Sequence, residues 1–143
     1  LRGMAKGIRV IDDYAHHPTE IRATIATARL AAGDGRVIAI FQPHRYSRTL
    51  AFSGEFADAL AAADSAVLLD IYSAGEEPIP GASSAAIAAA VNAKGGRALF
   101  EPNLMRAIDH AIAQAHSGDI ILTLGAGDVT SLGPQIISAI NER

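Results

Sequence analysis

The sequence predicts an α/β fold with a mostly parallel sheet of about six strands, an antiparallel first strand and helices on both faces. Short β-rich runs alternate with longer alanine-rich runs about five times along the 143 residues. This alternation is typical of a parallel sheet with crossover helices. Two of the short runs, residues 37–41 and 120–124, are almost entirely apolar, as expected for strands that are covered on both faces.

The N-terminal part of the chain predicts a hairpin followed by a helix. Residues 8–11 form a strand candidate, and residues 1–5 form its partner across a turn at residues 6–7. A helix follows from Pro18, because proline suits the first position of a helix, where its missing N–H is not needed. The glycine at position 33 ends this helix.

After the strand at residues 37–41, the middle of the chain predicts a helix, then another strand and then a long loop. The helix spans residues 49–62, and the next strand spans residues 66–69 and ends at Asp70. The loop at residues 72–82 contains two prolines and two glycines and fits neither periodicity. The inward-facing residues of the helix are expected to be Phe52, Phe56 and Leu60.

The C-terminal half continues the alternation. A serine at position 83 or 84 caps a helix, residues 97–100 form a short strand, and Asn103 caps the next helix. After strand 120–124, the last helix begins near Pro134. Its buried residues are expected to be Ile136, Ile137 and Ile140.

The composition limits the class of protein. A chain of 143 residues fits one domain, and half of its residues are apolar while 19% are charged, which favours a packed globule. The net charge of −3 gives no basic footprint for nucleic acid. No apolar run approaches the ~20 residues that cross a membrane, and no targeting signal is recognisable. Because the chain opens at Leu1 instead of a methionine, we expect a piece of a longer protein.

Polar side chains follow the predicted strands at the points where ligands bind to parallel sheets. They occupy residues 12–17, residues 42–48, Asp70 with Tyr72, and residues 125–128. Since the carboxyl ends of parallel strands share one edge of a sheet, we expect these four loops to converge there.

The first of these loops carries an acidic pair and a histidine pair. A carboxylate beyond a strand can accept the hydroxyls of a ribose, and neighbouring side chains alternate in direction, so one of Asp12 and Asp13 is expected to face a ligand. The other interpretation of Asp12 is that it accepts loop N–H groups. His16 can bind an anion or accept a proton near neutral pH, whereas simple helix capping is the alternative for His16 and His17.

The second loop carries a candidate anion site. Arg45 and Arg48 are three residues apart and adjoin His44. Guanidinium groups bind carboxylates or phosphates through paired hydrogen bonds. A solvated basic loop is the alternative, but the position directly after strand 37–41 favours a binding function.

The glycines at positions 125 and 127 predict a close approach of the backbone to a small ligand. A dinucleotide-binding motif is a weaker interpretation, because Thr130 occupies the place of the third glycine and the motif would follow the first strand of the fold. No spacing of His, Asp and Glu resembles a zinc site, and the sequence has no cysteine.

Four segments resemble the C-terminal domain of the Mur ligase family, in the family's order and spacing. They are residues 10–21 (VIDDYAHHPTEI), residues 41–49 (FQPHRYSRT), residues 70–81 (DIYSAGEEPIPG) and residues 122–128 (LTLGAGD). The second segment looks like the branch of the family that adds L-alanine. The resemblance implies a Rossmann-like fold and a single domain, residues 1–143, taken from a cytoplasmic enzyme of three domains.

The resemblance also implies the chemistry. ATP phosphorylates the carboxylate of UDP-N-acetylmuramate, and the amine of L-alanine attacks the acyl phosphate in peptidoglycan synthesis. The phosphate loop and the Mg ligands would belong to the central domain, and an N-terminal domain would bind the UDP-sugar. Neither of the two lysines, Lys6 and Lys94, follows a glycine-rich phosphate loop, so we expect this chain to be inactive by itself.

The resemblance implies roles for individual residues. Asp13 resembles the carboxylate that contacts the ribose of ATP. The residues that resemble the L-alanine and product site are Tyr14, His16, Arg45 and Arg48, with His44 beside them. His16 is a hypothetical base for the alanine amine. Ala15 departs from the glycine common in the family, and one methyl group gives too little binding energy to predict selectivity for L-alanine over glycine or L-serine.

Three alternatives remain at this stage. The recycling ligase that adds a tripeptide to UDP-N-acetylmuramate shares the first segment, although it diverges over residues 44–48. A receiver-type signalling domain would use Asp70 as phosphoacceptor, but no lysine follows strand 120–124. The third alternative is a free-standing module that binds an amino acid or a nucleotide.

Overall fold

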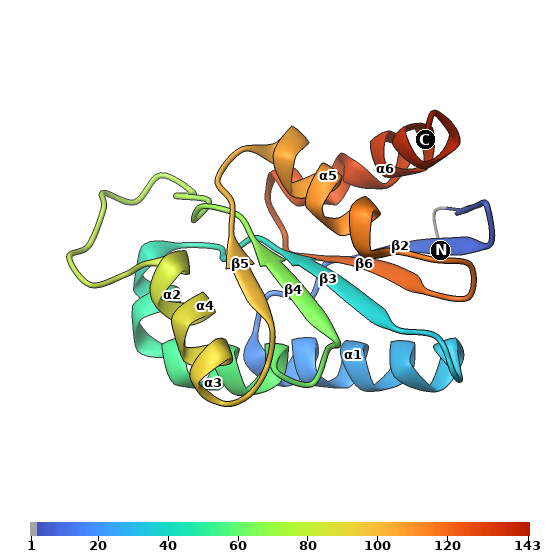
Figure 1. Ribbon diagram of the computed structural model, residues 1–143. Coiled ribbons are helices and arrows are strands. Elements are labelled where there is room, and N and C mark those ends of the chain that lie inside the picture. Colours follow the sequence, from blue (N-terminus) through green and yellow to red (C-terminus); the bar gives the residue numbers. More distant parts are fainter. Residues whose placement is uncertain (1–2) are drawn as a thin grey trace.

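Six strands form one mixed sheet in the order β1-β2-β6-β3-β4-β5 (Figure 1). The structure is a computed structural model and describes residues 3–143. The strands are β1 (Gly3–Ala5), β2 (Ile8–Asp13), β3 (Val37–Phe41), β4 (Ser65–Leu68), β5 (Ala98–Phe100) and β6 (Ile120–Leu124). β1 pairs with β2 in antiparallel fashion and all other neighbours are parallel. The predicted sheet is therefore confirmed, although residues 1–2 of the first predicted strand lie outside the described residues.

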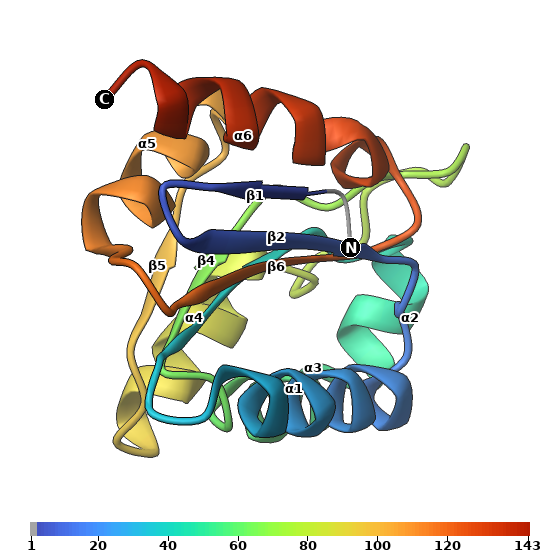
Figure 2. The same cartoon turned by 90° about the vertical axis from the view of Figure 1, so that its right-hand side faces the viewer.

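Helices cover both faces of the sheet (Figure 2). The helices α1 (Pro18–Ala32), α3 (Ser53–Leu60) and α4 (Ser84–Ala93) pack on one face, and α5 (Leu104–Gln114) and α6 (Leu132–Asn141) pack on the other. Each face of the sheet has its own hydrophobic core, and alternate residues of β3 point into one or the other. Val37, Ala39 and Phe41 belong to the first core, and Ile38 and Ile40 belong to the second. All five are buried, which explains why the strand shows no polar alternation.

The start of α1 follows from its sequence. His17 is the N-cap residue, Pro18 occupies the first turn, and Glu20 completes a capping box by accepting from the backbone N–H of His17. These contacts satisfy N–H groups that a helix leaves without intrahelical partners. The predicted start at Pro18 is confirmed, and His17 takes the helix-capping role that was the alternative to a binding function.

The prediction of a single helix over residues 49–62 is wrong. The chain forms two helices, α2 (Tyr46–Ala51) and α3, with a break at Phe52. Phe52 is only half-buried, and its ring lies 5.0 Å from that of His17. The break places this ring against the start of α1 instead of the centre of the core, where Phe56 and Leu60 are buried as expected.

The last helix begins near Pro134 as predicted, but one of its three expected buried residues is partly exposed. α6 begins at Leu132, after a short 3-10 turn, η1 (Asp128–Ser131), so Pro134 lies inside its first turn. Ile136 and Ile140 are buried as predicted, whereas Ile137 is partly exposed and lies next to Gly3 on the edge strand.

No helix within residues 3–143 combines the length and the apolar character that a membrane-crossing segment needs.

Candidate functional site

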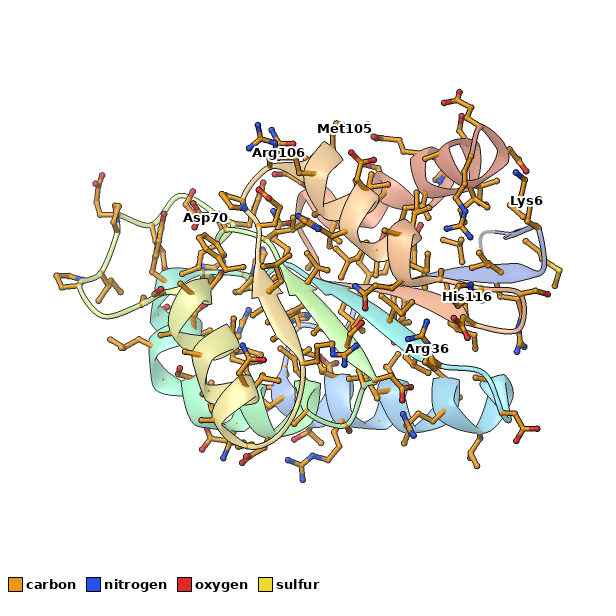
Figure 3. All side chains as sticks on the ribbon, in the orientation of Figure 1. Lys6, Arg36, Asp70, Met105, Arg106 and His116 are labelled. Carbon is orange, nitrogen blue, oxygen red and sulfur yellow. The ribbon has the colours of Figure 1, made fainter. Side chains whose placement is uncertain are left out.

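The carboxyl ends of the five parallel strands meet at one edge of the sheet. In the pairing register, Asp13 of β2 lies opposite Leu124 of β6, Leu124 opposite Phe41 of β3, and Phe41 opposite Leu68 of β4. Figure 3 shows Asp70 at this edge, with Arg36 near the opposite one. The predicted convergence of the strand-end loops is therefore confirmed.

The acidic pair divides between the two faces of the sheet. Asp12 accepts a hydrogen bond from the buried hydroxyl of Thr123, at 2.5 Å, on the neighbouring strand. Asp13 accepts from the backbone N–H of Ala15, at 2.8 Å, through Oδ1. Among residues 3–143, nothing hydrogen-bonds to its second oxygen, Oδ2, so this oxygen is available to a hydroxyl donor.

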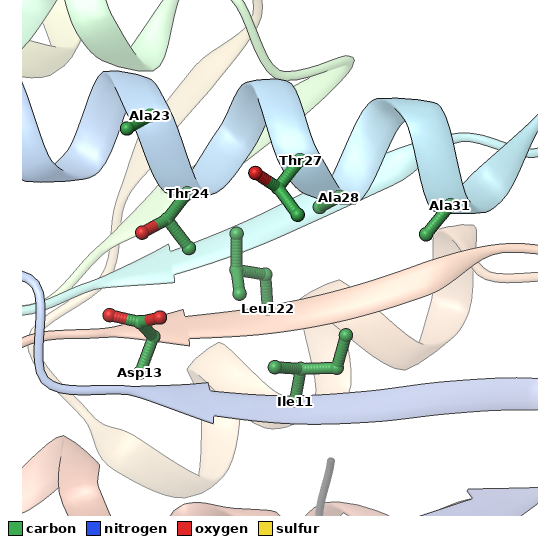
Figure 4. Close-up of a pocket in the computed structure, with 8 residues that line it drawn as sticks. All are labelled: Ile11, Asp13, Ala23, Thr24, Thr27, Ala28, Ala31 and Leu122. Carbon is green, nitrogen blue, oxygen red and sulfur yellow. The ribbon is translucent and has the colours of Figure 1, made fainter.

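A groove opens beside Asp13, between α1 and the sheet (Figure 4). Its volume is about 270 Å3 and its walls are mainly apolar. Figure 4 shows the carboxylate of Asp13 at one end, on the side of the sheet that faces α1. The other lining residues are Ile11, Ala23, Thr24, Thr27, Ala28, Ala31 and Leu122.

The ring of His16 has a defined tautomer in its neutral form. Its Nδ1 lies 2.9 Å from the carbonyl oxygen of Tyr14. Because a carbonyl can only accept a hydrogen bond, Nδ1 carries the hydrogen and Nε2 carries the lone pair. The side chain of His16 is 37% exposed, and none of the residues 3–143 hydrogen-bonds to Nε2. His17, in contrast, is committed to capping α1 and to its contact with Phe52.

Arg45 has a backbone φ of 75°, in a region that residues other than glycine rarely adopt. Such a conformation costs about 1–3 kcal/mol and persists only where surrounding contacts impose it. The N–H of Arg45 donates to the carbonyl of Tyr72 at 2.8 Å, and its own carbonyl accepts from the buried Thr49 hydroxyl at 2.7 Å. Within the described part of the chain, no carboxylate forms an ion pair with the exposed guanidinium of Arg45.

His44 lies at the centre of the site. The guanidinium of Arg48 donates to its Nδ1 at 3.3 Å, the ring of Tyr72 stacks on it at 5.4 Å, and the ring of His16 lies 6.0 Å away. Since arginine can only donate, the hydrogen of neutral His44 is on Nε2. Burial lowers the pKa of His44 below its ordinary value, and the positive charges of Arg48 and Arg45 lower this pKa further.

The structure therefore brings together three of the predicted site residues, His16, His44 and Arg48. It places Arg45 beside them with its side chain in solvent. Tyr14 is 71% exposed and takes part only through its carbonyl. Tyr72, which stacks on His44, was predicted only as a residue that follows a strand, because its partner is 28 positions away in the sequence.

The glycines after β6 lie close to other loops of this chain, and the expected approach of a small ligand stays a prediction. A Cβ at Gly127 would lie 2.6 Å from the ring of Tyr72 and 2.7 Å from Oε1 of Gln42. A Cβ at Gly125, whose φ is 141°, would lie 2.7 Å from the side chain of Val129. The glycines therefore allow the loop after β6 to pack against the loops after β3 and β4.

A second cavity of about 350 Å3 lies at the same edge and contains Asp70 and Asp128. Its other lining residues are Gln42, Tyr46, Leu69, Ile71, Tyr72, Ser73, Pro102 and Leu104. Over residues 3–143, no group of three or more His, Asp or Glu side chains gathers in a way that could hold a metal ion.

The family model "Mur ligase, glutamate ligase domain" matches residues 1–127 of the chain. The chain belongs to the Mur ligase family. It is 50% identical, over 143 residues, to the UDP-N-acetylmuramate–L-alanine ligase of Kineococcus radiotolerans. The match covers all of this chain and 30% of that protein, so the chain spans less than a third of the relative's length.

Solved structures of the family share the fold. The UDP-N-acetylmuramate-alanine ligase of Thermotoga maritima is 29% identical with a TM-score of 0.75, and the match covers 96% of this chain and 27% of that one. The murein peptide ligase of Psychrobacter arcticus is 26% identical with a TM-score of 0.78, over 99% of this chain and 29% of that one. Because the chain belongs to this family, the alternative of a receiver-type signalling domain is not favoured.

Proposed function

We propose that this chain is the C-terminal domain of a cytoplasmic, ATP-dependent ligase that adds L-alanine to UDP-N-acetylmuramate in peptidoglycan synthesis. Relatives with this name are about 50% identical over the whole chain, whereas the murein peptide ligase is 26% identical. The observation that carries the proposal is the cluster of His16, His44 and Arg48 beside Arg45 at the carboxyl edge of the sheet.

Arg45 and Arg48 bind the carboxylate of L-alanine in this proposal. Among residues 3–143, the guanidinium of Arg48 hydrogen-bonds to the uncharged Nδ1 and the carbonyl oxygen of His44, and Arg45 has no ion-pair partner. Two guanidinium groups on one segment favour an anion, and paired N–H donors match the geometry of a carboxylate. The Nε2–H of His44 adds a third donor.

His16 is proposed to accept a proton from the alanine ammonium group. The amine must lose its proton before it attacks an acyl carbon, and none of the residues 3–143 hydrogen-bonds to the lone pair on Nε2 of His16. A general base within hydrogen-bond reach of the amine is sufficient for this step. Tyr14, exposed beside His16, is proposed to close over the substrate.

Asp13 is proposed to bind the ribose of ATP through its free oxygen, Oδ2, at the mouth of the groove beside α1. The remaining chemistry is assigned to parts of the enzyme outside this chain. Mg and the phosphates of ATP are assigned to a central domain, as the resemblance to the Mur ligase family implies. UDP-N-acetylmuramate is assigned mainly to an N-terminal domain.

The test uses the full-length enzyme and compares L-alanine, glycine, L-serine and the tripeptide as acceptors in an ATP-dependent ligation assay. We expect L-alanine to be the preferred acceptor. Arg48→Ala should raise the KM for L-alanine about 10–100-fold, which corresponds to the loss of about 1.5–3 kcal/mol from hydrogen bonds to a charged group.

Arg106→Ala is the matched control, because Arg106 is exposed on α5 and its side chain has no partner among the described residues (Figure 3). Preference for the tripeptide, or an unchanged KM for L-alanine in Arg48→Ala, would overturn the proposal.

A further inference from the structure

The loop between β4 and α4 runs alongside the arginine segment, defined here as residues 44–48 (Figure 1). Its N-terminal part pairs with this segment as an additional strand would. The N–H of Tyr72 donates to the carbonyl of Pro43, and the N–H of Arg45 donates to the carbonyl of Tyr72, both at 2.8 Å. A parallel bridge between His44 and Tyr72 results.

Further along this loop, Glu76 binds the residue between the two arginines. Its Oε1 accepts from the backbone N–H of Ser47 at 3.0 Å, and its Oε2 accepts from the hydroxyl of Ser47 at 2.6 Å. Ser47 lies in the first turn of α2, whose N-cap residue, Arg45, supplies no side-chain cap. Glu76 therefore provides, from another loop, the cap that α2 lacks in its own sequence.

A tight turn presents Glu76 to Ser47. The N–H of Glu76 donates to the carbonyl of Ser73 at 3.0 Å, and the two central residues, Ala74 and Gly75, both have positive φ, at 52° and 88°. Positive φ at both central positions defines a narrow class of turn. The turn thus places the backbone of Glu76 so that its carboxylate reaches Ser47.

We propose that Glu76 is a positioning residue that holds Arg45 and Arg48 in the geometry that binds the alanine carboxylate. This inference rests on the proposed function. Glu76 is suited to the task because both of its oxygens are occupied by Ser47, so it fixes the segment without an ion pair to either arginine. The hydrogen bonds from Ser47 lower the pKa of Glu76, and the positive charge of Arg45 lowers it further.

The role is separable from stability of the core. Glu76 is partly exposed, and the hydrogen bonds of its carboxylate go to Ser47, which is exposed. Its removal should leave the two cores in place and release only the arginine segment. A residue that positions a carboxylate-binding group equally in the ground and transition states affects KM more than kcat.

The experiment compares three variants of the full-length ligase at this loop. Glu76→Ala removes both bonds to Ser47 and should raise the KM for L-alanine about tenfold, with kcat and the KM for ATP within about twofold. Glu76→Gln keeps an acceptor for the Ser47 N–H and a donor to its hydroxyl, so its KM for L-alanine should stay within about threefold of the wild type. Glu77→Ala removes an exposed neighbouring charge and should change nothing.

Ser47→Ala provides a second route if Glu76→Ala folds poorly, because it removes only the hydroxyl donor and should raise the KM for L-alanine about threefold. The inference is overturned if Glu76→Ala behaves like Glu77→Ala, if Glu76→Gln is as impaired as Glu76→Ala, or if the KM values for alanine and ATP rise together. The variant Arg48→Ala shows whether a negative result concerns only the positioning role of Glu76 or also the proposed function. If Arg48→Ala also leaves the KM for L-alanine unchanged, the alanine site itself is misplaced.

Discussion

The guanidinium of Arg48 lies 3.3 Å from Nδ1 of His44 and 3.3 Å from its carbonyl oxygen. Both contacts require His44 to accept. Protonation of His44 would put a hydrogen on Nδ1, facing the arginine, and would add a positive charge beside Arg45 and Arg48. The neutral imidazole is therefore an integral part of the arginine site, because it orients a guanidinium without compensating its charge.

His44 should titrate below the ordinary histidine value of about 6.5, and Arg48→Ala should raise its pKa. The shift should be partial, since burial is the largest cause of the lowered pKa and the charge of Arg48 comes second. The pH dependence of the His44 ring signals in NMR spectra measures the pKa. Arg106→Ala should leave it unchanged, and a His44 pKa above the ordinary value would contradict this account.

The lowered pKa of His44 also determines how the free energy of unfolding changes with pH. The folded chain binds a proton at His44 more weakly than the unfolded chain, so protonation favours unfolding. The contribution of His44 to the free energy of unfolding is therefore present above the unfolded pKa. It should be lost as the pH falls from about 6.5 through the lower folded pKa. His44→Gln should flatten the denaturation profile in this window.

Gly127→Ala should destabilise the chain by about 1–3 kcal/mol. The new methyl group would lie 2.6 Å from the ring of Tyr72 and 2.7 Å from Gln42 Oε1, so these side chains must move. Denaturant unfolding measures the loss. Gly54→Ala is the matched control, because nothing lies within 4 Å of its Cβ position in α3. It should stabilise the chain by about 0.5–1 kcal/mol, and equal effects of the two substitutions would refute the packing role of Gly127.

Asp119→Asn should destabilise the chain by about 1–3 kcal/mol. Asp119 is buried at the amino edge of the sheet and accepts from the backbone N–H of Arg36 at 2.8 Å and of His116 at 2.9 Å (Figure 3 shows both partners). An asparagine offers only one acceptor oxygen, so one N–H would face an NH2 group. Asp109→Asn, at an exposed position on α5, should be neutral in the same unfolding measurement.

Asp119 should also contribute to acid unfolding. Burial acts to raise its pKa, but the hydrogen bonds from Arg36 and His116 and the charge of Arg36 together outweigh burial and lower the pKa. Stability from a lowered carboxyl pKa is present above the unfolded value of about 3.9 and is lost as the pH falls through the folded value. Asp119→Asn should therefore reduce the slope of stability against pH in this acidic range.

Glu20→Ala should reduce the free energy of unfolding by about 0.5–2 kcal/mol, as loss of a helix cap does. Glu20 accepts from the backbone N–H groups of His16 and His17, and the bond from His16 is the main cause of its lowered pKa. Glu20→Gln preserves the capping box and should lose much less. If both variants unfold at the same denaturant concentration as the wild type, the cap contributes nothing measurable.

The sequence was sufficient to predict the fold class, the first antiparallel strand, the start of α1 and the edge of the sheet where the site lies. These features depend on periodicity, on proline and glycine, and on the rule that parallel strands end together, all of which act locally or follow from topology. The resemblance of four segments to the Mur ligase family rested on the same short stretches.

Tertiary structure alone decided how the site is held together. Ser47 and Glu76 are 29 positions apart, and Gln42 and Asp128 are 86 positions apart. Phe52, at the break between α2 and α3, contacts His17, and Gly127 lies against Tyr72 and Gln42. Such contacts form between side chains that meet only after the strands have aligned, so no local pattern in the sequence carries them.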